Sequence, residues 1–289
     1  MKRLFLAIAA IAVLALPASA AAVPPYHPTG EYAKFADCPL NVTTLNACLY
    51  AEEKSGQFTI GKKTVPIVKT QILQGGIEFD DELRTTFYGA ADGNTLPRTP
   101  QFVPGGLAGI TAPSWWPQIL KDLFNETINN GFTGVTATVE LAGPASAIKF
   151  SPLALLFREG TALAMPIKVK LENPFLGNSC YIGSNSNPIK LNMTAGKTAP
   201  PPPNTPIEGN PGTGTENPAG TIVTTSGQRL VDNSFAAPGA NGCGGFLFSW
   251  AVDPFVNSIV GVPSPAGTNT GILEGTLNLG NPEAIKASE

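Results

Sequence analysis

Apolar and polar residues alternate strictly in three segments of the chain. In "AMPIKVKLEN" (164–173), Ile167, Val169 and Leu171 alternate with lysine and glutamate side chains. The segments "PIKLNMT" (188–194) and "GILEGTLNL" (271–279) show the same pattern. A period of two places one row of side chains on a core and the other row in water, as is typical of antiparallel sheets.

Further strands are predicted at 63–73 and 131–143, and two shorter ones at 57–61 ("QFTIG") and 220–225 ("GTIVTT"). Pro66 lies in the first of these and suits an edge strand, because proline cannot donate a ladder hydrogen bond. We therefore expect a mainly β fold, an antiparallel β-sandwich or barrel with one or two short packed helices.

Two segments have helical character. In 112–131, apolar residues recur at spacings of three and four, Ser114 is a candidate cap and Gly131 ends the run. The segment 244–263 is apolar enough to predict a buried helix, bent near Pro254.

A long Pro-rich segment, "APPPPNTPIEGNPGTGTENPAG" (199–220), separates two predicted strands. Its prolines favour polyproline II, and few of its other residues can pack in a core. A linker here would leave a small second domain, so we favour a surface loop within one disulfide-stabilised domain spanning 35–282.

The first twenty residues, "MKRLFLAIAAIAVLALPASA", read as a secretory signal peptide with cleavage after Ala20 or Ala22. We predict a flexible segment at 21–34 and a tail at 283–289. No later segment has eighteen consecutive apolar residues, so no transmembrane anchor is expected after cleavage. The predicted location is extracellular or cell-wall associated.

Charge narrows the choice of partners. Lys2 and Arg3 leave with the signal peptide, so 16 of the 18 basic residues remain against 21 acidic ones, a net charge of −5. Nucleic acid is excluded as a partner, because phosphate binding needs a basic surface. A cell-envelope polymer or another extracellular protein remains a candidate.

Histidine chemistry is not expected, because the single histidine, His27, lies in the predicted flexible segment. The four cysteines, Cys38, Cys48, Cys180 and Cys243, form an even set in an exported chain and predict disulfides. Three pairings are possible. We favour Cys38–Cys48 and Cys180–Cys243, worth about 2.7 and about 4.3 kcal/mol in the chain-entropy model. The sequence indicates no metal site and no cofactor.

The remaining candidates for chemistry are carboxylates and tryptophans. "IEFDDELR" (77–84) contains Asp80 and Asp81, which could serve a hydrolase as part of a carboxylate pair or bind calcium. A solvated turn is the favoured interpretation of this cluster. Trp115 lies off the apolar stripe of its predicted helix and is the better candidate for an exposed binding platform, whereas Trp116 is expected in the core.

Three stretches carry a family resemblance: "ENPFLGNSCYIGSNSNPIKLNMTAGKTAPPPPNTPIEG", "LVDNSFAAPGANGCGG" and "GVPSPAGTNTGILEGTL". In these the chain resembles an uncharacterised family of actinobacterial secreted proteins, over 35–277. The resemblance implies export. That family has no established activity, so the resemblance implies no substrate and no functional residue.

Three hypotheses for function remain. The preferred one is a non-enzymatic secreted or envelope-associated β-domain that binds a partner or covers a surface. The second is a hydrolase of carbohydrate or cell-wall polymer that uses carboxylates. The third is a carrier of a small apolar ligand inside a β-barrel, which would need a closed apolar cavity of roughly 300 Å³ or more.

Overall fold

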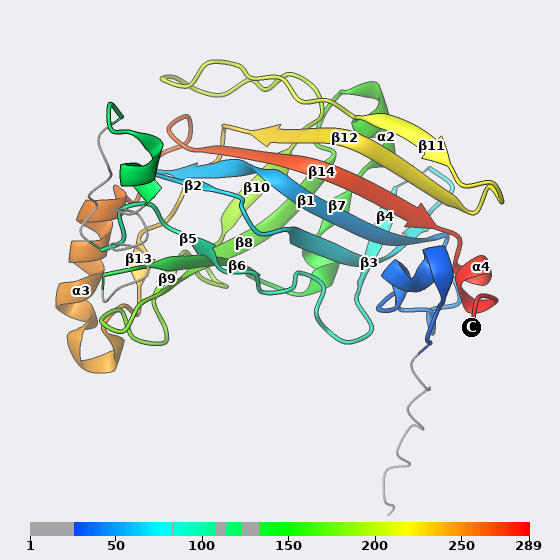
Figure 1. Cartoon of the computed structure of the whole chain (residues 1–289), viewed down its shortest axis with the longest axis horizontal. Coiled ribbons are helices and arrows are strands. Elements are labelled where there is room, and N and C mark those ends of the chain that lie inside the picture. Colours follow the sequence, from blue (N-terminus) through cyan, green and yellow to red (C-terminus); the bar gives the residue numbers. More distant parts are fainter. Residues whose placement is uncertain (1–25, 83, 108–113, 123–132) are drawn as a thin grey trace, which may run out of the picture.

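Two antiparallel β-sheets pack face to face in the computed structural model, which describes residues 26–82, 84–107, 114–122 and 133–289 (Figure 1). The fold is mainly β and sandwich-like, as predicted, and it is not a closed barrel. The predicted signal peptide lies outside the described residues.

The first sheet has the strand order β11-β12-β14-β1-β3-β4, and β2 pairs with β1 beside this path. Its strands are β1 (Ala47–Ile60), β2 (Lys63–Pro66), β3 (Gln71–Phe79), β4 (Thr85–Gly89), β11 (Thr213–Glu216), β12 (Ile222–Asp232) and β14 (Thr270–Gly280). The three long central strands β12, β14 and β1 carry most of its ladder.

The second sheet has the order β13-β9-β8-β6-β5, and β7 and β10 also pair with β8. Its strands are β5 (Gln101–Phe102), β6 (Thr136–Leu141), β7 (Lys149–Phe150), β8 (Leu163–Glu172), β9 (Tyr181–Ile182), β10 (Ile189–Met193) and β13 (Ala240–Asn241). Two short helices, η2 (Ala145–Ala147) and α2 (Pro152–Phe157), flank β7.

The alternation seen in the sequence is the alternation of burial in the structure. Along β8, Ile167, Val169 and Leu171 are buried, and the residues between them are partly exposed. Strand β10 repeats the pattern, and Leu273 and Leu277 of β14 face the same core. The apolar rows of the two sheets therefore form one core between them.

The predicted strand at 63–73 is interrupted. Residues 67–70 leave the ladder between β2 and β3, and Ile67 packs in the core while Val68 is exposed. The predicted strand at 131–143 is β6, which begins later, at Thr136.

The Pro-rich segment 199–220 is a surface loop, fastened to the body by hydrogen bonds. The side-chain nitrogen of Asn204 donates to the backbone oxygens of Asn233 and Asn269, each at 2.8 Å. The end of the loop forms β11, an edge strand that the sequence did not predict. Such anchoring fits a loop within one domain.

The described part of the predicted flexible segment, residues 26–34, packs with the predicted tail, so neither is a free segment. Residues 21–25 lie outside the described residues. Residues Gly30–Phe35 form the short helix η1, and Pro282–Lys286 form α4 (Figure 1). Phe35 and Ile285 are buried in a small second core against the end of the first sheet. The backbone nitrogen of His27 donates to Glu289 at 2.8 Å. Apolar side chains at 35 and 285 are the physical reason that these ends are ordered.

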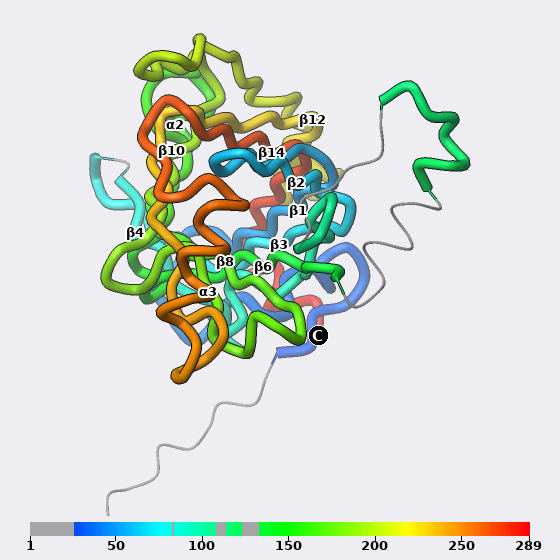
Figure 2. The backbone as a smooth tube through the Cα atoms, turned by 90° about the vertical axis from the view of Figure 1, so that its left-hand side faces the viewer, coloured from blue at the N-terminus to red at the C-terminus, as the bar shows by residue number. Residues whose placement is uncertain are grey.

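Helix α3 (Gly245–Val260) was predicted to be buried, and this prediction was wrong. The helix lies across the end of the sandwich that is remote from the C-terminus, where Figure 2 shows it facing the viewer. Only Val256 is buried along it, whereas Phe246, Leu247 and Trp250 are strongly exposed. Asp253 accepts from the backbone nitrogen of Cys243, and Asn257 accepts from that of Ala240 at 2.7 Å. Val252 and Val260 are partly buried against the core, while the large aromatic side chains of the helix face outward.

Of the predicted helix at 112–131, the structure describes 114–122. Within this part, residues 118–122 are helical. The remainder of that prediction, including Gly131, lies outside the described residues.

Two disulfides fasten the fold. Cys38 bonds to Cys48 and Cys180 to Cys243, the pairing favoured from the sequence, with Cα atoms 5.6 and 4.0 Å apart. The second bond joins the residue before β9 to the loop before α3 and is fully buried. Together they fit an oxidising environment outside the cell. Within the described part of the chain, no helix is long and apolar enough to cross a membrane.

Candidate functional site

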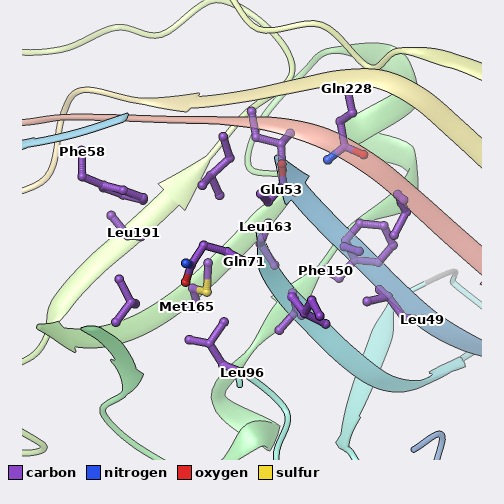
Figure 3. Close-up of a pocket in the computed structure, with 17 residues that line it drawn as sticks. Leu49, Glu53, Phe58, Gln71, Leu96, Phe150, Leu163, Met165, Leu191 and Gln228 are labelled. Carbon is purple, nitrogen blue, oxygen red and sulfur yellow. The ribbon is translucent and has the colours of Figure 1, made fainter. Parts of the chain in front are cut away.

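The space between the two sheets is not completely filled. Two neighbouring apolar cavities lie there, of about 60 and about 70 Å³, and they share Phe58, Gln71 and Val139 as lining residues. The first cavity is lined from both sheets, as Figure 3 shows. Protein interiors normally leave few voids larger than a water molecule, so this pair of cavities is the principal candidate site.

Two polar side chains of the first sheet line the first cavity beside each other. Glu53 on β1 and Gln228 on β12 both pair with Gly275 on the intervening strand β14. Figure 3 shows both side chains among the leucine and phenylalanine side chains of the cavity. The carboxyl group of Glu53 and the amide group of Gln228 thus line a cavity whose other walls are mostly apolar.

A β-bulge next to each residue sets these positions. The β1 ladder shifts register between Glu53 and Ser55, and the β12 ladder shifts between Ser226 and Gln228. The extra residue in β12 is Gly227, whose φ of +69° is readily adopted only by glycine. Bulges re-aim side chains and are common beside functional sites. Here two bulges lie opposite the same stretch of β14.

Gly275 leaves room for the carboxyl group. A Cβ atom at this position would lie 2.7 Å from Glu53 Oε2 and 1.9 Å from the backbone oxygen of Glu52. Any larger residue would therefore displace the carboxyl group or the β1 backbone.

Both polar side chains are almost fully buried and incompletely paired. Glu53 is 8% exposed and Gln228 is 4% exposed. Glu53 Oε2 and Gln228 Oε1 have no hydrogen-bond partner among the residues that the structure describes. By contrast, the Nε2 of Gln71 donates to the backbone oxygens of Lys69 and Thr99 at 3.2 Å. Since buried polar atoms are nearly always hydrogen-bonded, the two free acceptors need an explanation.

Burial also changes the acidity of Glu53. Removal from water raises the pKa of its carboxyl group to about 7, and the negative charge of Glu274 adds to this effect. Glu274 does not line the cavity; its carboxylate is paired with Arg229 Nε at 3.1 Å and accepts from Ser55 Oγ at 3.0 Å. Strongly shifted pKa values concentrate at functional sites.

The second cavity extends toward the end of the sandwich that carries α3. Val260, the last residue of α3, lines it together with Ile182 of β9. Lys63 of β2 also lines it, and partial burial lowers the pKa of this lysine. The two cavities adjoin at Phe58, Gln71 and Val139, and together, called the slot below, they extend from the Glu53–Gln228 pair toward α3.

The residues selected from the sequence lie elsewhere. Asp80 and Asp81 occupy the exposed turn between β3 and β4, where Asp80 pairs with Arg84 at 2.7 Å and this contact lowers the pKa of its carboxyl group. Neither lines the slot. Trp115 is 79% exposed, as expected, and its ring meets Trp116 edge-on at 6.1 Å. Trp116 is half-buried and does not belong to the core.

The arrangement is suited to holding a molecule. Among the described residues, Glu53 is the only acidic side chain that lines either cavity, whereas glycoside hydrolysis needs two carboxyl groups across one cleft. No group of three or more potential metal ligands occurs in the part of the chain that the structure describes.

The sequence contains a signal for the burial of Glu53. Leu49, Ala51 and Glu53 lie two residues apart, so extending the apolar alternation of "CLYAEE" by one step places Glu53 on the buried face. Gln228 likewise lies two residues from the apolar Leu230, so the same alternation places it on the buried face.

Comparison with known proteins gives no further assignment: no family model, curated protein or solved structure matches the chain.

Proposed function

We propose that the chain is an exported, non-enzymatic binding protein that holds a small apolar molecule between its two β-sheets. The observation that carries the proposal is the unfilled apolar slot with the Glu53–Gln228 pair at one end. A well-formed apolar pocket with a few polar groups and a shifted pKa is the usual form of a small-molecule site.

The size of the slot restricts the ligand. Cavities of about 60 and about 70 Å³ are well below the roughly 300 Å³ of a pocket for a drug-sized molecule. A narrow, unbranched hydrocarbon chain fits such a slot better than a fused ring system. It could pass from one cavity to the other beside Val139, whose side chain lines both.

Export is supported by the amino-terminal sequence and by the two disulfides. The single carboxyl group in the slot favours binding over hydrolysis, because a lone acid has no partner to act as nucleophile or base.

The proposal is tested by filling the slot. Heptyl methyl ether, a narrow chain with no hydrogen-bond donor, is titrated into the oxidised protein by calorimetry. We expect saturable binding, and we expect Val139→Phe to weaken it at least tenfold because the larger ring occupies both cavities. Val68→Phe is the matched control, since Val68 is exposed on the surface.

A second measurement does not depend on the variant being folded. The ¹²⁹Xe resonance of dissolved xenon should shift with the concentration of the unaltered protein, because xenon enters dry apolar cavities. Absence of both ether binding and a xenon shift would overturn the proposal, as would equal ether binding by the Val139→Phe and Val68→Phe proteins.

A further inference from the structure

We propose that the Glu53–Gln228 pair binds the polar end of the ligand and selects a hydrogen-bond donor, a hydroxyl or amino group, on a narrow hydrocarbon chain. This inference rests on the proposed function and goes beyond it, because it assigns a head-group chemistry and the two residues that recognise it.

The unpaired atoms of the pair determine the chemical class of the ligand's head group. Glu53 Oε2 and Gln228 Oε1 are both buried oxygens, and neither has a hydrogen-bond partner in the described part of the chain. While Glu53 is ionised, both oxygens can only accept, so the partner that satisfies them must supply N–H or O–H groups. A ligand with only acceptor atoms, such as an ether, would leave both oxygens unpaired, which is costly in a buried site.

The charge at the site disfavours a carboxylate head group at pH 8, where Glu53 is mostly ionised. An ionised carboxyl group placed beside the ionised Glu53 would be repelled and would also face the unpaired oxygen of Gln228. Arg229, which follows Gln228 on β12, is already paired with Glu274 and so does not compensate such a charge. Among the described residues, Lys63 is the one basic side chain that lines the slot, and it belongs to the second cavity.

The geometry brings the two acceptors to one place. Their strands flank β14, both residues pair with Gly275, and glycine puts no side chain between them. The remainder of the first cavity is hydrocarbon, including Leu163, Leu191 and Phe150 from the second sheet. A head group at the pair thus leaves its chain in apolar surroundings.

Four ligands of equal chain length test the selection: 1-octanol, octylamine, octanoic acid and heptyl methyl ether, each titrated by calorimetry at pH 8. We expect 1-octanol and octylamine to bind about tenfold more tightly than the ether, the difference expected for one buried hydrogen bond to a polar or charged acceptor. Octanoic acid should bind more weakly than the ether.

Matched variants assign the effect to the pair. Glu53→Met and Gln228→Met replace each acceptor by an apolar chain of similar length, and each should reduce the preference for 1-octanol over the ether to less than threefold. Glu52→Met makes the same change at the neighbouring residue of β1, which does not line the slot, and should retain the full preference. Ether binding by the variants shows that the slot is intact.

A pH series separates the two head groups. The pKa of Glu53 is raised to about 7, so its carboxyl group is mostly protonated at pH 6 and mostly ionised at pH 8. Glu274, on the adjacent strand, contributes to this shift, and Lys63 is the other charged group of the slot. Octylamine carries a positive charge throughout this range, so its binding should strengthen from pH 6 to pH 8 more than that of 1-octanol.

The outcomes are distinguishable. If the ether binds as tightly as 1-octanol, or octanoic acid binds most tightly, the head-group assignment is overturned while the proposed function stands. The assignment also fails if octylamine binding does not change between pH 6 and pH 8. If none of the four ligands binds, the assignment and the proposed function both fail.

Discussion

Glu53 on β1 and Gln228 on β12 occupy the same row of the first sheet, separated only by Gly275 of β14. Each lies beside a β-bulge, and each presents a buried oxygen without a partner to the apolar space between the sheets. The β-bulges in β1 and β12 thus place two polar side chains together in an otherwise apolar interior.

The first prediction concerns stability and pH. The pKa of Glu53 is raised from 4.5 to about 7 in the folded protein, so ionisation of this group opposes folding. The cost is absent below pH 4.5, grows as the pH rises toward 7 and is complete above it, at about 3 kcal/mol for a shift of this size. Glu53→Gln should therefore raise the free energy of unfolding at pH 8 and leave it nearly unchanged at pH 4.

Urea unfolding of both proteins at several pH values measures this difference. The result of interest is the difference between wild type and variant, because other groups titrate equally in both. A difference that is the same at pH 4 and pH 8 would show that Glu53 is not the group responsible.

The second prediction concerns Gly275. Gly275→Ala places a Cβ atom 1.9 Å from the backbone oxygen of Glu52, so β1 must move. We expect a loss of about 1–3 kcal/mol in the free energy of unfolding. Gly214→Ala in β11 is the control, because nothing lies within 4 Å of its added Cβ, and it should change stability by less than about 0.5 kcal/mol. Similar effects of the two changes would contradict the tight packing at Gly275.

The third prediction concerns the disulfides. The Cys180–Cys243 bond closes a chain segment of 63 residues and the Cys38–Cys48 bond one of 10. The chain-entropy model therefore gives losses of about 4 and about 3 kcal/mol when each pair is replaced by alanine. Denaturant unfolding of the two double variants under oxidising conditions should show the larger loss for the 180–243 pair. The reverse order would indicate that local packing at residues 38 and 48 outweighs loop length.

The fourth prediction concerns α3. Val256 is 4% exposed and packs in the main core, whereas Trp250 on the same helix is 79% exposed. Val256→Ala should lower the free energy of unfolding by about 2 kcal/mol, through lost burial and a small cavity. Trp250→Ala should change it by less than about 0.5 kcal/mol. A large loss for Trp250→Ala, measured by urea unfolding, would place that side chain in contact with the body of the protein.

The strands with unbroken alternation could be predicted from the sequence alone. Strand β8 is the plainest example, because every second side chain from Leu163 to Leu171 is buried. Apolar and polar residues alternate there with the same period of two as the side chains of a strand. The side chains that face the core could therefore be assigned from the sequence.

The bulges explain why the candidate site was missed. Before the bulge in β1, the side chains of Leu49, Ala51 and Glu53 line the first cavity; after it, those of Phe58 and Ile60 line the slot. This change from odd to even positions breaks a period of two. The sequence therefore yielded only the short strand 57–61, and Glu53 lay in the unassigned part.

The prediction that helix α3 is buried was wrong for a different reason. Its apolar composition predicted burial, but composition does not specify which elements are available to cover a helix. Strand β13 is the edge of the second sheet at this end, and beside it the helix buries mainly its valine side chains and leaves Phe246, Leu247, Phe248, Trp250 and Phe255 exposed. Conversely, Phe35 and Ile285 are isolated apolar residues in polar surroundings, too sparse to predict the small core that they form at the other end.

The packing of the chain ends has a mechanical consequence. Strand β1 starts where β14 finishes, with Cys48 paired to Gly280, and the ladder runs from there to Thr59 and Thr270. A force that pulled η1 away from α4 would therefore act on the first pair of this ladder alone. The central strands would separate one hydrogen-bonded pair after another, as a zipper opens, and the sheet would yield at a lower force than if all pairs were loaded in shear together.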